Sequence, residues 1–317
     1  MSDLAEPIPG VIPGRHPNRA LGYALCAGAA ALFAINGTVS KSILIGAMDA
    51  VHLSQLRVTA AFLILFVVVA VTRPSALRIR RQEIGILLAY GVLGVSMTQF
   101  LYFVSIERLP VGVALLIEFT APIMVALWFR FGMHHPVHRL VWVGLIVALV
   151  GLGLVGQVWQ GFTLDSIGVL AGFGAAAALA VYFLLGDRQV RPPYARDAVS
   201  LTMWGFGGAA LFWCIAAPWW NFPWSELAGT GESLAGITSP VWALALWMIV
   251  LGTVAPFWLE VMALQNIRAS QVSVIAMLEP LLAIGIAWIA LGEQLAPVQV
   301  IGAFVVLGGV YLTERSR

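Results

Sequence analysis

The chain has 317 residues, of which 61% are hydrophobic and only 10% are charged, whereas a soluble globular protein is about a quarter charged. This composition excludes a water-soluble globular protein and indicates that lipid surrounds most of the chain. The net charge of +2 is small, and two cysteines predict neither a disulfide framework nor a thiol-bound metal site.

Apolar stretches of membrane-spanning length follow one another along the chain. A hydrocarbon core about 30 Å thick needs roughly 20 apolar residues per helix. Ten such helices are predicted near residues 20–41, 51–72, 84–106, 110–130, 139–157, 165–186, 198–219, 241–263, 270–291 and 297–313. They leave almost nothing for a soluble domain, and the proline-rich residues 1–19 are expected to form a disordered cytoplasmic tail.

The basic residues alternate between the predicted loops. If the N-terminus is cytoplasmic, 14 of the 17 basic residues lie inside, Lys41 and Arg108 lie outside, and Arg57 lies within a helix. This distribution follows the positive-inside rule. It predicts an inner-membrane protein with both termini in the cytoplasm, and it makes a nucleic-acid partner a poor interpretation of the arginines.

The second half of the chain repeats the first. Residues 109–154 align without gaps on residues 267–312 at a shift of 158, and the first helices of the two halves align at a shift of 146. The repeated prolines and glycines carry most weight: Pro122 with Pro280, Gly144 with Gly302, and Gly151 with Gly309. Five helices per half is an odd number, so the halves must cross the membrane in opposite directions. The sequence therefore predicts an all-α polytopic membrane protein of two inverted five-helix repeats, 20–158 and 159–317.

Several motifs resemble a known family. They are FAINGTVSK at 33–41, QLR at 55–57, SVIAMLEPLLAIGIAWIALGEQL at 273–295 and IGAFVVLGGV at 301–310. The chain resembles the EamA family of the drug/metabolite transporter (DMT) superfamily over essentially its whole length. Residues 106–127, IERLPVGVALLIEFTAPIMVAL, resemble the homoserine/threonine exporter branch. The resemblance implies a ten-helix bundle with a central cavity, alternating access, and export of amino acids or related metabolites.

Two acids lie near the centres of predicted helices. Glu118 and Glu279 start within about 3 Å of the midplane at a rise of 1.5 Å per residue, where a charge is costly unless it is paired or faces water. Glu118 aligns with Ala276, three positions before Glu279, so the acids lie roughly 60° apart on corresponding helix faces. Both are therefore predicted to face one cavity.

A proline follows each acid. Proline lacks an N–H and frees the carbonyl four residues before it, which belongs to Glu118 for Pro122 and to Ala276 for Pro280. Interrupted helices near the midplane of both halves point to a transporter binding site. The alternative is that the prolines only kink the helices and that Glu279 accepts hydrogen bonds from a neighbouring helix.

Arg57 lies roughly 8 Å deep from the outer surface, by the rise per residue of a helix. We expect it to pair with Glu118, or to bind a substrate carboxylate when Glu118 is protonated. The alternative is an arginine that extends to the outer headgroups. Glu260 lies near the cytoplasmic end of its helix, where ordinary solvation is expected.

Further polar residues fall in the outer parts of predicted helices. Asn36, Gln99 and Tyr102 are candidate donors and acceptors for a polar substrate, and Trp258 is a candidate aromatic wall whose alternative role is interior packing. The glycines most simply permit close helix contact; they are Gly144, Gly151, Gly168, Gly172, Gly302 and Gly309.

Missing motifs narrow the function. The chain has no phosphate-binding G-x-x-x-x-G-K-[ST] and no H-E-x-x-H, and the histidines of one cytoplasmic loop, His134, His135 and His138, are expected to be solvated. We therefore predict no enzyme, no cofactor and no metal. The favoured function is a secondary exporter of small polar metabolites, in particular amino acids, with protons as candidate coupling ions and a monomer or homodimer as the functional unit. The alternatives are a multidrug exporter of cationic compounds and a membrane-embedded enzyme or lipid scramblase.

Overall fold

A computed structural model describes residues 18–109, 111–134, 136–157, 165–192, 194–230, 239–282 and 296–315. These residues form helices and connecting turns, with no strand among them beyond one isolated bridge between Thr230 and Pro240. Nearly all of the predicted tail, His135 and residues 283–291 of the predicted ninth helix lie outside the described residues.

Seven helical segments are long and apolar enough to cross a membrane: Arg19–Ile45, Ala50–Thr72, Arg81–Arg108, Gly112–Gly132, Ser166–Val190, Ala198–Ala216 and Val241–Leu264. Three shorter apolar helices, Arg139–Val155, Ala269–Leu282 and Pro297–Thr313, coincide with the other predicted segments. The all-helical, multi-span architecture is therefore confirmed, whereas the count of ten spans and the inversion of the second half stay predictions.

The first half contains α1 (Arg19–Gly46), α2 (Ala50–Thr72), α3 (Ile84–Ala89), the π-helix η3 (Tyr90–Ser96), α4 (Met97–Arg108), α5 (Val111–Glu118), α6 (Ala121–Leu127), the π-helix η4 (Trp128–Gly132) and α7 (Arg139–Val155). The second half contains α8 (Ser166–Val190), α9 (Ala198–Ala216), α10 (Val241–Ile249), the π-helix η7 (Val250–Val254), α11 (Ala255–Leu264), α12 (Ala269–Ala276) and α14 (Pro297–Arg315). Short 3-10 turns cover Pro74–Leu77, Arg81–Glu83, Trp219–Asn221 and Trp224–Ala228.

Polar side chains begin three of the long helices. Asn18, Asp49 and Asp165 accept hydrogen bonds from backbone N–H groups in the first turns of α1, α2 and α8. Side chains of this type satisfy N–H groups that have no partner inside the helix. The apolar runs therefore become helices with defined starts.

The two halves pack crosswise. Helix α1 of the first half packs against α11 of the second, and α8 of the second half packs against α4 of the first. The same contact occurs once in each pair of helices. Gly252 lies against Asn36, whose side chain a Cβ on Gly252 would overlap, and Gly94 lies against Tyr182, whose Cα would be 3.0 Å from a Cβ on Gly94. Gly94 and Gly252 are 158 positions apart, and Asn36 and Tyr182 are 146 apart, which are the two shifts of the repeat.

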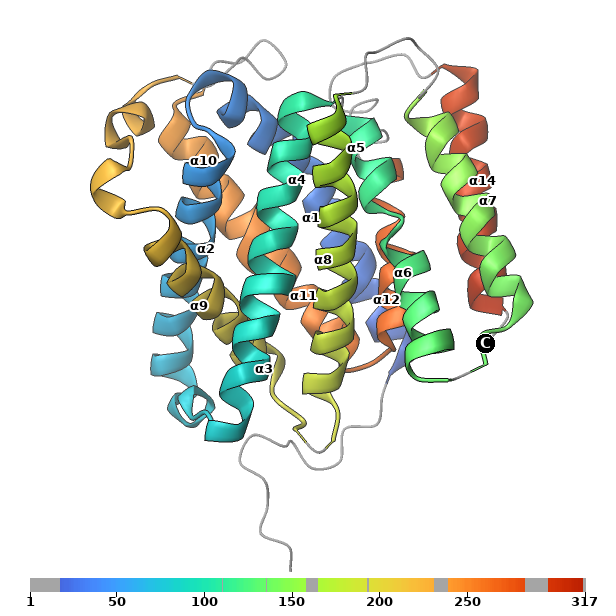
Figure 1. The fold of residues 1–317 in the computed structure, drawn as a ribbon, viewed down its shortest axis with the longest axis horizontal. Helices are drawn as coiled ribbons and strands as arrows, with labels where there is room; N and C mark the ends of the chain where they lie inside the picture. The colour runs from blue at the N-terminus through green and yellow to red at the C-terminus, as the bar shows by residue number, and fades with distance from the viewer. Residues whose placement is uncertain are drawn as a thin grey trace, which may run out of the picture.

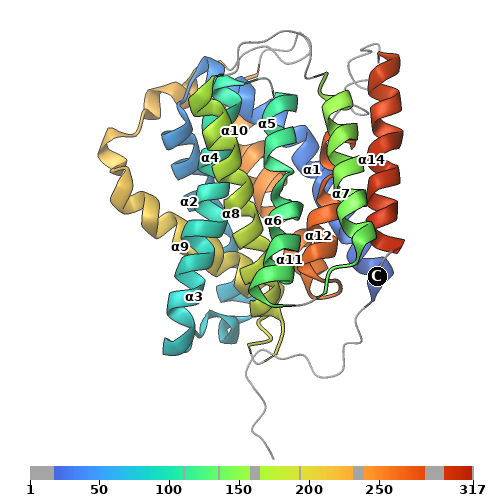
Figure 2. The same ribbon diagram turned by 45° about the vertical axis from the view of Figure 1, so that its right-hand side comes forward.

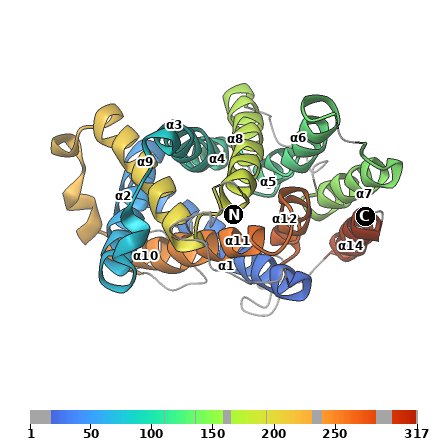
Figure 3. The same ribbon diagram turned by 90° about the horizontal axis from the view of Figure 1, so that it is seen from below.

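Helices α7 and α14 lie side by side at one edge of the bundle (Figures 1, 2 and 3). A Cβ on Gly144 would lie 2.6 Å from the carbonyl oxygen of Gly309, and one on Gly151 would lie 2.9 Å from that of Gly302. Real Cβ atoms do not approach this closely, so these positions require glycine. The prediction that the repeated glycines permit close helix contact is confirmed here.

Candidate functional site

A cavity lies among α1, α2, α4, α5, α8, α11 and α12. Its empty volume is about 570 Å³, counting the part open to its surroundings, which is within the usual range of small-molecule sites. The polar lining residues are Asn36, Arg57, Thr98, Gln99, Tyr102, Glu118, Glu260 and Glu279. The other lining residues are Phe33, Gly37, Phe119, Leu179, Phe183, Phe257 and Ala276.

Six of the residues proposed from sequence line this one cavity, although their helices are far apart in the chain: Asn36, Arg57, Gln99, Tyr102, Glu118 and Glu279. The hydroxyl of Tyr102 is buried and has no hydrogen-bond partner among the described residues. Trp258 is not among the lining residues and is 38% exposed; its neighbour Phe257 lines the cavity instead.

Arg57 is the largest charged side chain in the bundle interior and is 1% exposed. Its Nε donates to the hydroxyl of Thr253 at 2.5 Å, and its Nη2 donates to the carbonyl of Gly252 at 2.7 Å. The guanidinium carbon also lies 5.4 Å from the centre of the Phe103 ring. The headgroup alternative is therefore wrong for this structure, since the side chain points into the bundle.

The direct ion pair between Arg57 and Glu118 is not formed either. No carboxylate of the described residues lies within 4.0 Å of the guanidinium. The partners found instead are uncharged, and the Nη1 donors have no partner in the described part of the chain. The positive charge thus remains available to a ligand in the cavity.

Pro256 explains why the Gly252 carbonyl can accept this bond. A proline provides no N–H for the carbonyl four residues before it, and that residue is Gly252. The π-helix η7 covers the same stretch, where Thr253 donates to the carbonyl of Met248 at 2.8 Å while it accepts from Arg57. The rule that predicts freed carbonyls at Glu118 and Ala276 also predicts this one at Gly252, from Pro256.

Two helices are interrupted beside the cavity. Helix α5 ends at Glu118 and α6 begins at Ala121, while α12 ends at Ala276 and helical structure resumes at Glu279. Pro122 and Pro280 leave the carbonyls of Glu118 and Ala276 without an intrahelical donor. Glu118 and Ala276 both line the cavity. Each half therefore brings one broken helix to the same place.

Glu260 corrects the sequence interpretation. It was expected in a solvated, interfacial position, but it is 4% exposed and lines the cavity. The prediction was wrong about the face of the helix on which Glu260 lies. Helix α11 packs against α1, α8 and α9, and Glu260 is on the packed side.

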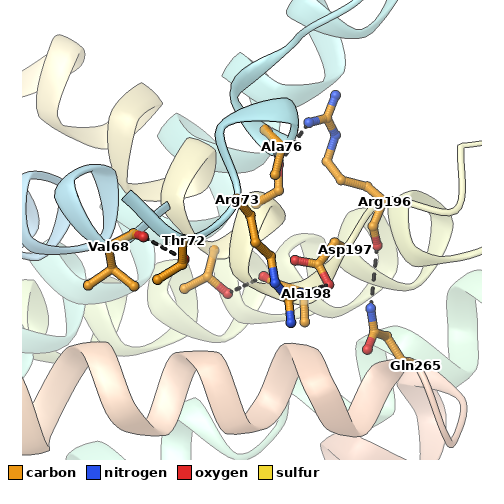
Figure 4. A network of polar contacts seen from close by, with 10 residues as sticks. Val68, Thr72, Arg73, Ala76, Arg196, Asp197, Ala198 and Gln265 are labelled. Carbon is orange, nitrogen blue, oxygen red and sulfur yellow. Dashed lines mark hydrogen bonds and ion pairs between the residues drawn. The ribbon is translucent and has the colours of Figure 1, made fainter. Parts of the chain in front are cut away.

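A polar network lies at one end of the bundle (Figure 4). Arg196 forms a buried ion pair with Glu83 and donates to Ser200 at 3.0 Å, and its carbonyl accepts from Gln265 at 3.5 Å. Arg73 pairs with Asp197 at 3.1 Å beside it. The network joins the segment after α2 to the start of α9 and the end of α11, so it links the two halves.

The other end carries a weaker ion pair. Arg108 and Asp165 are 3.7 Å apart, and their side chains are 42% and 40% exposed. Side chains at the two ends therefore differ in how firmly they join the halves.

The described residues contain no group of three or more His, Cys, Asp or Glu side chains that could hold a metal ion.

An apolar bundle that encloses polar and charged side chains at the junction of two similar halves is the architecture of a membrane transporter. Residues 20–157 and 166–315 match the EamA-like transporter family, and the chain belongs to this family. It is a multi-span membrane protein of the transporter class.

Two curated relatives illustrate the similarity. The chain is 30% identical over 255 residues to the threonine/homoserine exporter RhtA of Escherichia coli (strain K12), covering 79% of each protein. It is 25% identical over 261 residues to the uncharacterized transporter YdfC of Bacillus subtilis (strain 168), covering 82% of this chain and 80% of that one. A solved crystal structure covers 93% of this chain and 96% of its own, with a TM-score of 0.72 and 15% identity, which shows the fold alone.

Proposed function

We propose that this protein is a secondary-active exporter of amino acids or amino-acid-like metabolites. The observation that carries the proposal is that one guanidinium and three carboxyls, from Arg57, Glu118, Glu260 and Glu279, line a single cavity. The similarity to a threonine/homoserine exporter supports the same substrate class.

The cavity offers complementary partners to both charges of an α-amino acid. The Nη1 donors of Arg57 suit the α-carboxylate, since guanidinium–carboxylate bonds are short and strong. Glu118 and Glu279 suit the α-ammonium, and the unpartnered Tyr102 hydroxyl adds a donor or acceptor. Burying either charge of the substrate is favourable only when partners of this kind replace water.

Three carboxyls face one guanidinium in this cavity. An excess of buried negative charge is costly, and a proton or the ammonium of a substrate would neutralise it. We propose that protons exchange with the substrate at these acids, with Glu118 as the coupling residue. Transport would then depend on the proton gradient.

The proposed transport cycle is alternating access between two five-helix halves of opposite orientation in the inner membrane, with both termini cytoplasmic. The Arg196–Glu83 network lies among the arginine-rich loops assigned to the cytoplasm. We propose that this network closes the cytoplasmic side and that the cavity faces outward in this state. Opening inward would break the ion pair between the halves.

The test is transport by the purified protein in proteoliposomes. Labelled amino acids inside the vesicles should leave faster with the protein than without it, and a proton gradient should change the rate. Absence of movement for every amino acid tested, with correctly folded protein, would reject the proposal.

The excess of carboxyls also favours a second candidate, an exporter of cationic drugs. Such a protein would use Glu118 and Glu279 to bind the cation and would have no need of the guanidinium of Arg57. A resistance panel in an overexpressing strain separates the two functions. Raised tolerance to several lipophilic cations, without amino acid transport, would select the drug exporter.

A further inference from the structure

The cavity is built from equivalent positions of the two halves. Gly37 and Phe183 are related by the shift of 146, while Gln99 with Phe257 and Glu118 with Ala276 are related by the shift of 158. All six residues line the cavity. The two halves thus present the same backbone positions to the ligand from opposite sides.

The side chains at these positions differ in character. At these three pairs the first half contributes a glycine, an amide and a carboxyl, and the second half contributes two phenylalanines and an alanine. Two other equivalent pairs line the cavity as well: Phe33 and Leu179 are both apolar, and Tyr102 is matched by Glu260. Leu179 lies four residues before Phe183 on α8, so it faces the same side of the helix. Leu179, Phe183 and Phe257 are called the apolar wall below.

The apolar wall is held firmly in place. The ring of Phe257 packs edge-on against Phe33 and Phe206, with centroids 5.2 Å apart in each case, and Phe183 packs against Tyr182 at 5.3 Å. Phe183 is 1% exposed. The side chains of the wall carry no hydrogen-bonding atom, so the wall selects by its chemistry.

The wall favours one kind of substrate side chain. A hydroxyl placed against these residues would lose its hydrogen bonds to water without gaining others, which is unfavourable. Methyl and methylene groups placed there are removed from water, which is favourable. Apolar pockets distinguish ligands that differ by one methylene by about 10-fold to 200-fold.

We infer that the substrate is an α-amino acid with an apolar side chain, whose charged groups face Arg57 and Glu118 and whose side chain lies against the apolar wall. The inference rests on the proposed function. It separates this chain from its relative named for threonine and homoserine, because both of those amino acids carry a hydroxyl on the side chain.

The experiment compares leucine, threonine and homoserine in proteoliposomes that contain the purified full-length chain. Leucine efflux should exceed threonine and homoserine efflux by about 10-fold or more, and unlabelled leucine should compete better than either in the same proportion. The Leu179→Thr variant should lower the leucine-to-threonine ratio by about 10-fold, since it places a hydroxyl on the apolar wall.

The matched control is Leu170→Thr, which makes the same change on α8 at a side chain that is 72% exposed. It should leave the ratio unchanged. Threonine or homoserine transport equal to or faster than leucine transport would overturn the inference while leaving the proposed amino acid exporter intact. Failure of all three to move would overturn the inference, and failure of every amino acid tested would reject the proposed function as well. The competition measured on the unaltered protein decides the matter even if Leu179→Thr does not fold.

Discussion

Arg57→Gln tests the role of the buried guanidinium. In the structure Arg57 donates two hydrogen bonds, to Thr253 and to Gly252, and its Nη1 faces no described acceptor. Glutamine retains one amide donor for the neighbouring helix but loses the charge. A hydrogen bond to a charged group contributes about 1.5–3 kcal/mol, and about 1.4 kcal/mol corresponds to a factor of 10 in affinity. The apparent affinity for an amino acid should therefore fall by roughly 10-fold to 150-fold.

The assay uses a pair of ligands that differ only in the carboxylate. Leucine and isopentylamine compete for transport of labelled leucine by the unaltered protein and by Arg57→Gln. Leucine should lose affinity in the variant, while isopentylamine, which has no carboxylate, should not. Equal losses for both ligands would refute the reasoning, because they would mean that Arg57 only supports the packing of α2 against η7.

Breaking a buried ion pair costs about 3–5 kcal/mol, so Glu83→Gln and Arg196→Gln should each lower the melting temperature. The double variant should lower it by less than the sum of the two single effects. Additive decreases would mean that the two side chains are not coupled. Gly309→Ala should lower the melting temperature, because its Cβ would lie 2.5 Å from the backbone of Ala148, whereas Gly308→Ala, with no atom within 4 Å, should not; equal effects would contradict the α7–α14 packing. Glu118→Gln should abolish the dependence of efflux on the proton gradient while allowing exchange of labelled for unlabelled substrate, and a retained dependence would place coupling elsewhere.

Helix breakers and composition predicted much of the architecture. The prolines and glycines shared by the halves mark positions where the backbone itself is constrained, and the structure confirms close helix contact at Gly144 and Gly309, although which glycines would meet was not predicted. Such residues are informative because lipid-facing and buried apolar side chains look alike in a sequence. A glycine that recurs in both halves is a candidate for a position where a side chain would not fit.

The faces of individual helices were harder to predict. These helices are apolar on all sides, so the periodicity that reveals the buried face of a soluble helix is weak. Glu260 was therefore assigned to solvent although it lines the cavity, and Trp258 was chosen where the adjacent Phe257 lies against the cavity. The uncharged partners of Arg57 were not predicted, because a carbonyl without an intrahelical donor leaves no side-chain pattern in the sequence. The only sequence sign of the Gly252 carbonyl is Pro256, four residues later.

The α7–α14 contact has a mechanical consequence. Helix α7 of the first half and α14 of the second form this pair, and at the repeated glycines the backbone of one helix lies directly against the other. Interfaces of this kind tolerate little sliding, since small displacements bring main-chain atoms into overlap. We expect the pair to act as a fixed pivot, so that the largest displacements during transport occur on the opposite side of the bundle, around α2 and α9.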